Sequence, residues 1–129
     1  MKPIPTATAK IFIVEDNLVY QQLIAKELEK LSGDIHFFTK GESCLEALDL
    51  NPSIIVLDYD LAGRLNGLDT LKSIRATNPE VYTILFSNQP NLDNKENIST
   101  YGFFDFIEKK PTAFHDLREK IVSNCRIAC

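Results

Sequence analysis

The stretch SIIVLDYDLAG, residues 53–63, joins an unbroken apolar run to two acids. The run consists of Ile54, Ile55, Val56 and Leu57, three of which are β-branched. Such a run is typical of a strand that is buried on both faces, the usual condition in a parallel sheet. Asp58 follows it directly, and Asp60 comes after one tyrosine. The stretch therefore predicts a buried parallel strand that carries carboxylates to its carboxyl end.

Short apolar runs alternate with amphipathic segments along the rest of the chain. The predicted strands are residues 10–14, 34–38, 53–57, 82–86 and 104–108. The predicted helices are residues 18–31, 42–50, 67–76, 91–102 and 113–127, of which 91–102 has the weakest apolar pattern. The helix over 18–31 is expected to place these leucines and isoleucine near one face, with Gly33 as its C-cap: Leu18, Leu23, Ile24, Leu28 and Leu31. The alternation predicts an α/β fold, a doubly wound five-stranded parallel sheet with helices on both faces.

Composition narrows the class of protein. A chain of 129 residues with 44% hydrophobic and 25% charged residues is expected to form one domain, here residues 9–129 after a flexible leader at 1–8. The net charge of -4 argues against nucleic acid as a direct partner, and no run of residues predicts a membrane span or a signal peptide. Three cysteines without a close pair favour a reducing cytosol, so the expected location is cytoplasmic.

Polar side chains follow four of the five predicted strands. Glu15 and Asp16 follow the first strand, Asp58 and Asp60 the third, Ser87 the fourth and Lys109 the fifth. In doubly wound sheets, function gathers outside the carboxyl ends of the strands. We therefore expect these side chains to meet at one edge of the sheet.

Carboxylates held close together repel unless they are protonated or bind a cation. A site that has a few carboxylate oxygens as ligands and room for water suits Mg²⁺. A carboxylate can also act as a nucleophile towards phosphorus and form an aspartyl phosphate. Phosphoryl transfer then requires alignment and charge neutralisation, for which a metal, a hydroxyl and a lysine suffice. The predicted edge contains each of these groups.

Four stretches in order, IFIVEDN, IIVLDYDLAGRLNGLDTLKSIR, ILFSN and GFFDFIEK, resemble the motifs of a response regulator receiver domain. The resemblance extends over about residues 10–127 and implies the flavodoxin-like strand order 2-1-3-4-5. It implies that Asp58 is the phosphoacceptor, that Ser87 and Lys109 bind phosphoryl oxygens, and that Phe106 is the switch aromatic.

The same resemblance implies a magnesium site. Asp16 and Asp58 would bind Mg²⁺ directly, and Glu15 would act through water. Asp60 would contribute its backbone carbonyl, while its side chain is expected to face solvent.

The chain also departs from the family pattern. The loop from Asp58 to Gly67 is one residue longer than usual, and Asn88 stands where the family prefers alanine or glycine. Pro111 comes one place late, so Lys110 is a rival for the role of the lysine. A cis bond before a residue other than proline costs about 3–4 kcal/mol, which favours a trans bond or a shifted loop here.

The leading hypothesis is a phosphorelay receiver, a signalling switch rather than an enzyme, with at most self-catalysed phosphotransfer and dephosphorylation. Its expected partners are a sensor histidine kinase or phosphotransfer protein and a downstream protein or fused output domain. The face made by the fourth helix, fifth strand and fifth helix would bind that partner or a second copy. Two alternatives are a phosphorylation-independent interaction module and, remotely, an aspartate-nucleophile phosphohydrolase that would use Asp60 as its acid and base.

Each site residue also has a simpler interpretation. Asp58 could be a solvated acid at the end of a strand. Glu15 and Asp16 could serve only to cap the first helix, and Ser87 could cap a turn. Lys109 could be an ordinary surface lysine. For Glu15 and Asp16, capping and metal binding can coexist.

Overall fold

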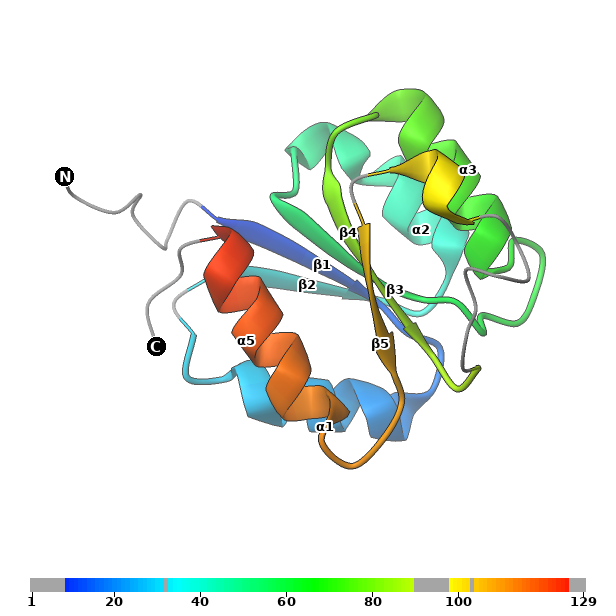
Figure 1. Ribbon diagram of the computed structural model, residues 1–129. Coiled ribbons are helices and arrows are strands. Elements are labelled where there is room, and N and C mark those ends of the chain that lie inside the picture. The colour runs from blue at the N-terminus through cyan, green and yellow to red at the C-terminus, as the bar shows by residue number, and fades with distance from the viewer. Residues whose placement is uncertain (1–8, 32, 90–97, 103, 126–129) are drawn as a thin grey trace, which may run out of the picture.

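The computed structural model of the chain describes residues 9–31, 33–89, 98–102 and 104–125. Its centre is a five-stranded parallel sheet in the order β2-β1-β3-β4-β5 (Figure 1). The strands are β1 (Lys10–Val14), β2 (Asp34–Phe38), β3 (Ile54–Asp58), β4 (Tyr82–Ser87) and β5 (Phe104–Glu108). The sheet confirms the predicted fold class and strand order.

Helices cover both faces of this sheet. The α-helices are α1 (Leu18–Leu28), α2 (Gly41–Glu46), α3 (Gly67–Thr77) and α5 (Ala113–Cys125), and the 3₁₀ helices are η2 (Leu48–Leu50) and η3 (Ile98–Tyr101). Helices α1 and α5 lie on one face, and α2 and α3 lie on the other (Figure 1). Helices therefore cover the sheet on both faces, as the alternating pattern of strands and helices predicts.

Successive strand residues supply two separate cores. Ile54 and Val56 of β3 pack with α1 and α5, whereas Ile55 and Leu57 pack with α2 and α3. Side chains alternate between the faces of a strand, so a strand covered on both faces needs apolar residues at consecutive positions. This explains why the apolar run in β3 is unbroken. Packing on both faces also holds the end of β3 rigidly in the centre of the sheet.

Two helix predictions need correction. Helix α1 ends at Leu28 rather than at residue 31, and Leu18 and Leu23, expected on its buried face, are 62% and 43% exposed. The helix expected over 42–50 is interrupted at Ala47, where α2 gives way to η2. The helix expected over 91–102 lies mostly outside the described residues, and its described end is the 3₁₀ helix η3. The leader expected at 1–8 also lies outside the described residues.

Two strands end one residue later than the sequence pattern predicts. β3 extends from Ile54 to Asp58, and β4 extends from Tyr82 to Ser87. Asp58 and Ser87 are therefore the last residues of neighbouring strands rather than the first residues of loops, with Asp58 in register with Phe86. Strand pairing fixes their backbone, which limits how far either side chain can move.

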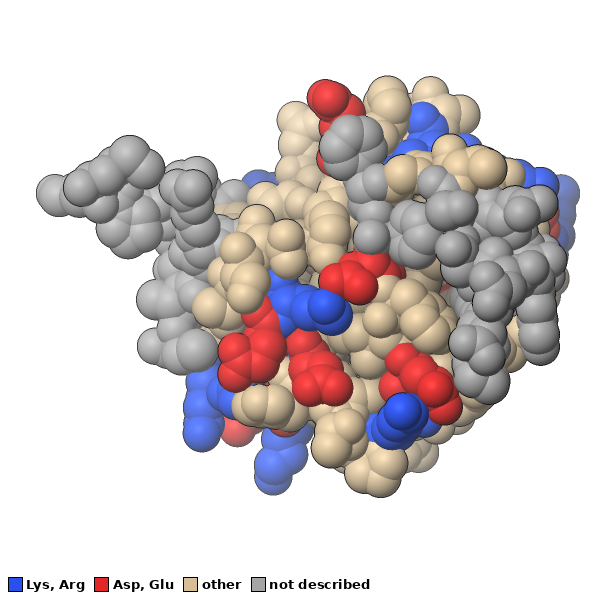
Figure 2. Space-filling view, in the orientation of Figure 1, with Lys and Arg blue, Asp and Glu red and all other residues tan. Residues whose placement is uncertain are grey.

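Charges of both signs are interspersed over the described part of the face shown in Figure 2, without a continuous basic stripe there. In the described part of the chain, no helix combines the length and the apolarity needed to cross a bilayer. A basic stripe is the usual electrostatic footprint of nucleic-acid binding. The described part of this face therefore carries mixed charge rather than charge of one sign.

Candidate functional site

Three carboxylates meet at the carboxyl edge of the sheet. One ligand oxygen each from Glu15, Asp16 and Asp58 can be chosen so that all lie within 4.8 Å of one another. Glu15 and Asp16 follow β1 directly, and Asp58 ends β3, which pairs with β1. Asp58 is 2% exposed. The neighbouring strand ends therefore bring together acids that are far apart in the sequence.

The oxygens of this acidic cluster, Glu15, Asp16 and Asp58, fit a hard divalent cation. Glu15 Oε1 is buried and accepts no hydrogen bond from the described residues. The Lys109 ammonium, 3.4 Å from this oxygen, partly compensates its burial, and a metal ion beside the three carboxylates would compensate it further. Three carboxylates with space for water are the donor set that Mg²⁺ accepts. The residues present thus match the magnesium site that the sequence resemblance implies.

The start of α1 holds Glu15 and Asp16 in place. Asn17 caps the helix by accepting hydrogen bonds from the amides of Val19 and Tyr20, and its own amide donates to Glu15 Oε2 at 3.1 Å. Asp16 Oδ2 accepts from the Ala62 amide at 3.0 Å, across the loop that follows β3. The helix cap is therefore Asn17, and the two acids remain directed towards Asp58.

Lys109 lies inside the site. Its Nζ is 3.0 Å from Asp58 Oδ1 and 3.4 Å from Glu15 Oε1, and its side chain is only 4% exposed. Its amide donates to the Ser87 carbonyl at 2.7 Å, which aligns the residue with the end of β4. The interpretation as a surface lysine does not fit this geometry.

The rival lysine lies outside the site. The Lys110 side chain is 60% exposed, and its ammonium is 3.7 Å from Glu108 Oε1. No peptide bond among the described residues is cis, so the Lys109–Lys110 bond is trans. The late position of Pro111 is therefore accommodated without a cis bond at this point.

Burial shifts the charges of the site. The pKa of the Glu15 carboxyl is raised from its ordinary 4.5 to about 8, first by burial and then by Asp58, while Lys109 and the Asn17 amide act in the opposite direction. Burial acts to lower the pKa of the Lys109 ammonium, but the charges of Asp58 and Glu15 outweigh it, so that this pKa is raised. Without a metal ion the site therefore retains a proton on Glu15 and a charged lysine at neutral pH.

We expect the metal-free protein to lose stability as the pH rises from the ordinary pKa of Glu15 towards its folded pKa of about 8. A raised pKa means that the folded state holds the proton more tightly than the unfolded state, so this stabilisation is complete at low pH and lost through the folded pKa. Mg²⁺ should oppose the loss, because it binds ionised carboxylates. Urea unfolding at several pH values, with Mg²⁺ or with a chelator, measures both effects.

The control for this prediction is Glu15→Gln, which removes the titrating carboxyl but keeps the size of the side chain. Its metal-free stability should vary much less over the same pH range. A metal-free wild type that becomes more stable across that range contradicts the assignment.

Asp60 differs from the expectation that its side chain faces solvent. Its carboxylate accepts hydrogen bonds from Ser87 Oγ at 3.1 Å, from the Asn88 amide at 2.8 Å and from Gln89 Nε2 at 3.1 Å. Ser87 at the end of β4 and the turn that follows it supply these three donors. The role of the Asp60 carbonyl as a metal ligand stays a prediction.

Phe106 is half-buried against the core on the α2 and α3 side, where Tyr101 also packs. Its role as a switch remains a prediction.

Sequence reasoning missed Tyr20, whose ring centroid lies 4.5 Å from Lys109 Nζ. No sequence signal marks Tyr20, because an aromatic residue near the start of an amphipathic helix is ordinarily part of its packing face.

The chain is similar in sequence to parts of two longer proteins. A protein-glutamate methylesterase/protein-glutamine glutaminase of Clostridium acetobutylicum is 28% identical over 128 residues, covering 92% of this chain and 36% of that protein. The nitrogen assimilation regulatory protein NtrX of Azorhizobium caulinodans is 33% identical over 101 residues, covering 77% and 22% respectively. The chain thus spans about a third or less of these two relatives.

Solved structures share the fold. The receiver domain of a sensor histidine kinase from Pseudomonas aeruginosa, which has a magnesium ion coordinated in its active site cleft, superposes with a TM-score of 0.77 at 23% identity, covering 92% of this chain and 98% of that one. The family model for the response regulator receiver domain matches residues 11–122. The chain therefore belongs to the response regulator receiver domain family.

Proposed function

We propose that the chain is a Mg²⁺-dependent phosphoacceptor switch of a phosphorelay, with Asp58 as the residue that is phosphorylated. The observation that carries this proposal is the ammonium of Lys109, 3.0 Å from Asp58 Oδ1 and beside the acidic cluster. A buried lysine that faces a buried nucleophilic carboxylate is suited to neutralise an incoming phosphoryl group.

The transfer itself needs one nucleophile. A carboxylate oxygen of Asp58 attacks the phosphorus of a phosphohistidine on the donor, and the O–P bond forms as the N–P bond breaks. The electron pair of the N–P bond remains on the imidazole nitrogen, which takes a proton from solvent. The Asp60 amide donates to Asp58 Oδ1 at 2.8 Å and, with Lys109, fixes the orientation of the carboxylate.

Asp16 and Asp58 would hold Mg²⁺ directly, Glu15 through water and Asp60 through its carbonyl. When bound, the ion supplies positive charge that offsets the carboxylates and the phosphoryl oxygens. The magnesium ion in the Pseudomonas neighbour supports this assignment. Glu15 must release its proton for the ion to bind, which makes binding depend on pH.

The phosphorylated state would change the contacts of Ser87. A phosphoryl group on Asp58 competes with the Asp60 carboxylate for Ser87 Oγ and the Asn88 amide. Movement of Ser87 would leave space for Phe106 to turn inward, and the switch would then shift between two packings. The contacts that differ between the packings determine how far phosphorylation biases the equilibrium.

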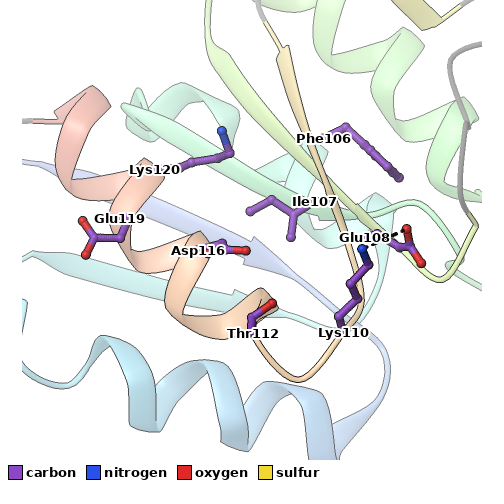
Figure 3. A pocket seen from close by; sticks show the side chains of 8 residues that line it. All are labelled: Phe106, Ile107, Glu108, Lys110, Thr112, Asp116, Glu119 and Lys120. Carbon is purple, nitrogen blue, oxygen red and sulfur yellow. Dashed lines mark ion pairs between the residues drawn. The ribbon is translucent and has the colours of Figure 1, made fainter.

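The output surface would include β5 and α5. A recess of about 450 Å³ lies between these elements, and Figure 3 shows Phe106, Lys110, Asp116 and Lys120 among the side chains around it. Phe106 borders this recess, while its side chain packs on the α2 and α3 side of β5, so its movement would alter β5 at the edge of the sheet, which a downstream protein or a second copy would contact. The sensor kinase or phosphotransfer protein would approach over the exposed Leu18 and Val19 at the start of α1.

The test is phosphorylation by a small-molecule donor. Wild type with Mg²⁺ and acetyl phosphate should gain the mass of one phosphoryl group, and a chelator should prevent the gain. Asp58→Asn, which keeps the shape of the side chain, should gain nothing under the same conditions. A wild type that gains no mass, or a gain that persists in Asp58→Asn, contradicts the proposal.

The contacts of Asp60 favour a second candidate, a receiver that binds its partner without phosphorylation. Its carboxylate already occupies the hydroxyl and the amide that a phosphoryl group needs. In that case Asp60→Asn should gain a phosphoryl group where wild type does not, and partner binding should be the same in Asp58→Ala. Equal phosphorylation of wild type and Asp60→Asn would exclude this candidate.

A further inference from the structure

The ammonium of Lys109 is held by aromatic rings as well as by carboxylates. Its Nζ lies 4.5 Å from the ring centroid of Tyr20 and 5.5 Å from that of Phe86. Among the described residues, these are the two rings within the distance at which a cation is attracted to an aromatic face. The attraction is strongest where water is excluded, and the Lys109 side chain is almost fully buried.

The ring of Tyr20 is itself fixed in place. Its amide donates to the Asn17 cap at 3.1 Å, so that its position on α1 follows from the same turn that holds Glu15. The ring contacts Phe86 at 6.5 Å and 84° and Phe114 at 6.1 Å. The contact with Phe86 is edge-on and that with Phe114 is tilted at 35°, and the two together restrict the orientation of the ring.

Lys109 has room to turn away from Asp58. A recess of about 220 Å³ is lined by Tyr20, Lys109, Lys110, Pro111 and Phe114. Lysine has a flexible stem and a strongly hydrated head, which would favour an orientation towards this recess. Glu15 also attracts the ammonium, at 3.4 Å, and so competes with Asp58 for it.

We propose that Tyr20 is a positioning residue for phosphoryl transfer, holding the Lys109 ammonium beside Asp58 through the face of its ring. This inference rests on the proposed function. When a phosphoryl group and Mg²⁺ engage Asp58, the carboxylate pulls less on the lysine, whereas the attraction of the ring is unchanged. Lys109 therefore remains directed at the acceptor throughout the transfer.

The test is a graded series at position 20. Tyr20→Phe keeps the ring and should phosphorylate from acetyl phosphate at close to the wild-type rate. Phenylalanines with increasing numbers of ring fluorines keep the shape but withdraw electron density from the face, so the rate should fall step by step. Tyr20→Leu should be slower by about tenfold. Phe38→Leu is the matched control, because it removes a ring that pairs with Phe12 in the core on the other face of the sheet and leaves Tyr20, Phe86 and Phe114 in place.

NMR of the metal-free protein provides a readout that does not need phosphorylation. The ε-methylene protons of Lys109 should show an upfield ring-current shift that is kept in Tyr20→Phe and lost in Tyr20→Leu. If wild type accepts no phosphoryl group, the proposed function fails, and this shift alone decides whether Tyr20 positions Lys109. A shift retained in Tyr20→Leu overturns the inference. Rates that do not respond to fluorination, or that fall equally in Phe38→Leu, overturn it while phosphorylation of Asp58 stands.

Discussion

Lys109→Met is expected to slow phosphorylation of Asp58 about a hundredfold, because it removes a buried charge aimed at the reacting group. The ammonium lies 3.0 Å from Asp58 Oδ1, and both side chains are almost fully buried, so solvent replaces the lost charge only poorly. Methionine is similar in length and apolar, which preserves the packing against Tyr20 and Phe86. The rate of mass gain from acetyl phosphate, measured at saturating Mg²⁺, tests this expectation.

Magnesium affinity should respond differently in the same variant. Without the lysine, no ammonium repels the ion or competes with it for Asp58, so Mg²⁺ should bind as tightly as in wild type or more tightly once Glu15 has released its proton. Titration of Mg²⁺ therefore separates loss of the lysine from loss of the metal site. A variant that fails to bind Mg²⁺ has lost the site as a whole.

Lys110→Met is the matched control for Lys109→Met. Lys110 is exposed and forms a surface ion pair with Glu108, which contributes little, so its loss should change the rate by about twofold at most. If Lys110→Met has the larger effect, the assignment of Lys109 is wrong.

Gly67→Ala is expected to lower the free energy of unfolding by about 3 kcal/mol, because the added methyl group would meet rigid backbone. Its Cβ would stand 2.6 Å from the carbonyl carbon of Tyr59 and closer still to the Tyr59 Cα and oxygen. Tyr59 directly follows Asp58, and its amide donates to the Phe86 carbonyl, so the strand end cannot yield without disturbing the sheet. Urea unfolding measures the loss.

Gly63→Ala is the control for this clash. Gly63 has φ of +97° but no atom within 4 Å of its added Cβ, so its substitution tests backbone strain alone. A left-handed conformation costs a residue with a side chain about 1–2 kcal/mol. We therefore expect the smaller loss in Gly63→Ala. Equal losses in the two variants would mean that the approach of α3 to Tyr59 is looser than the structure indicates. Phosphorylation of Gly67→Ala should also be slower, because the displaced segment carries the acceptor.

The sequence by itself determined the layered fold and the edge at which the site lies. The strands at 10–14, 34–38 and 104–108 agree with β1, β2 and β5 to the residue. β1 is predicted because a strand covered on both faces needs apolar residues at consecutive positions, whereas the edge strands β2 and β5 are marked by their aromatic and β-branched residues. The polar residues that follow these runs then had to gather at one edge, since parallel strands end together.

The extent of the helices was less visible in the sequence. Leu18 and Leu23 fit an apolar helical face but remain exposed, because α5 and the sheet cover only the part of α1 around Ile24 and Leu28. Periodicity shows which residues could be buried, whereas the neighbouring elements decide which of them are.

Tertiary structure alone decided which polar groups contact one another within the site. Whether Asp60 faces solvent or binds Ser87 depends on the turn after β4, which lies 27 residues away along the chain. The ring of Tyr20 reaches Lys109 only because α1 and the end of β5 converge on β4, where Phe86 completes the contact. Contacts of this kind are set by distances and angles between elements far apart in sequence, and local patterns of residues carry no record of them.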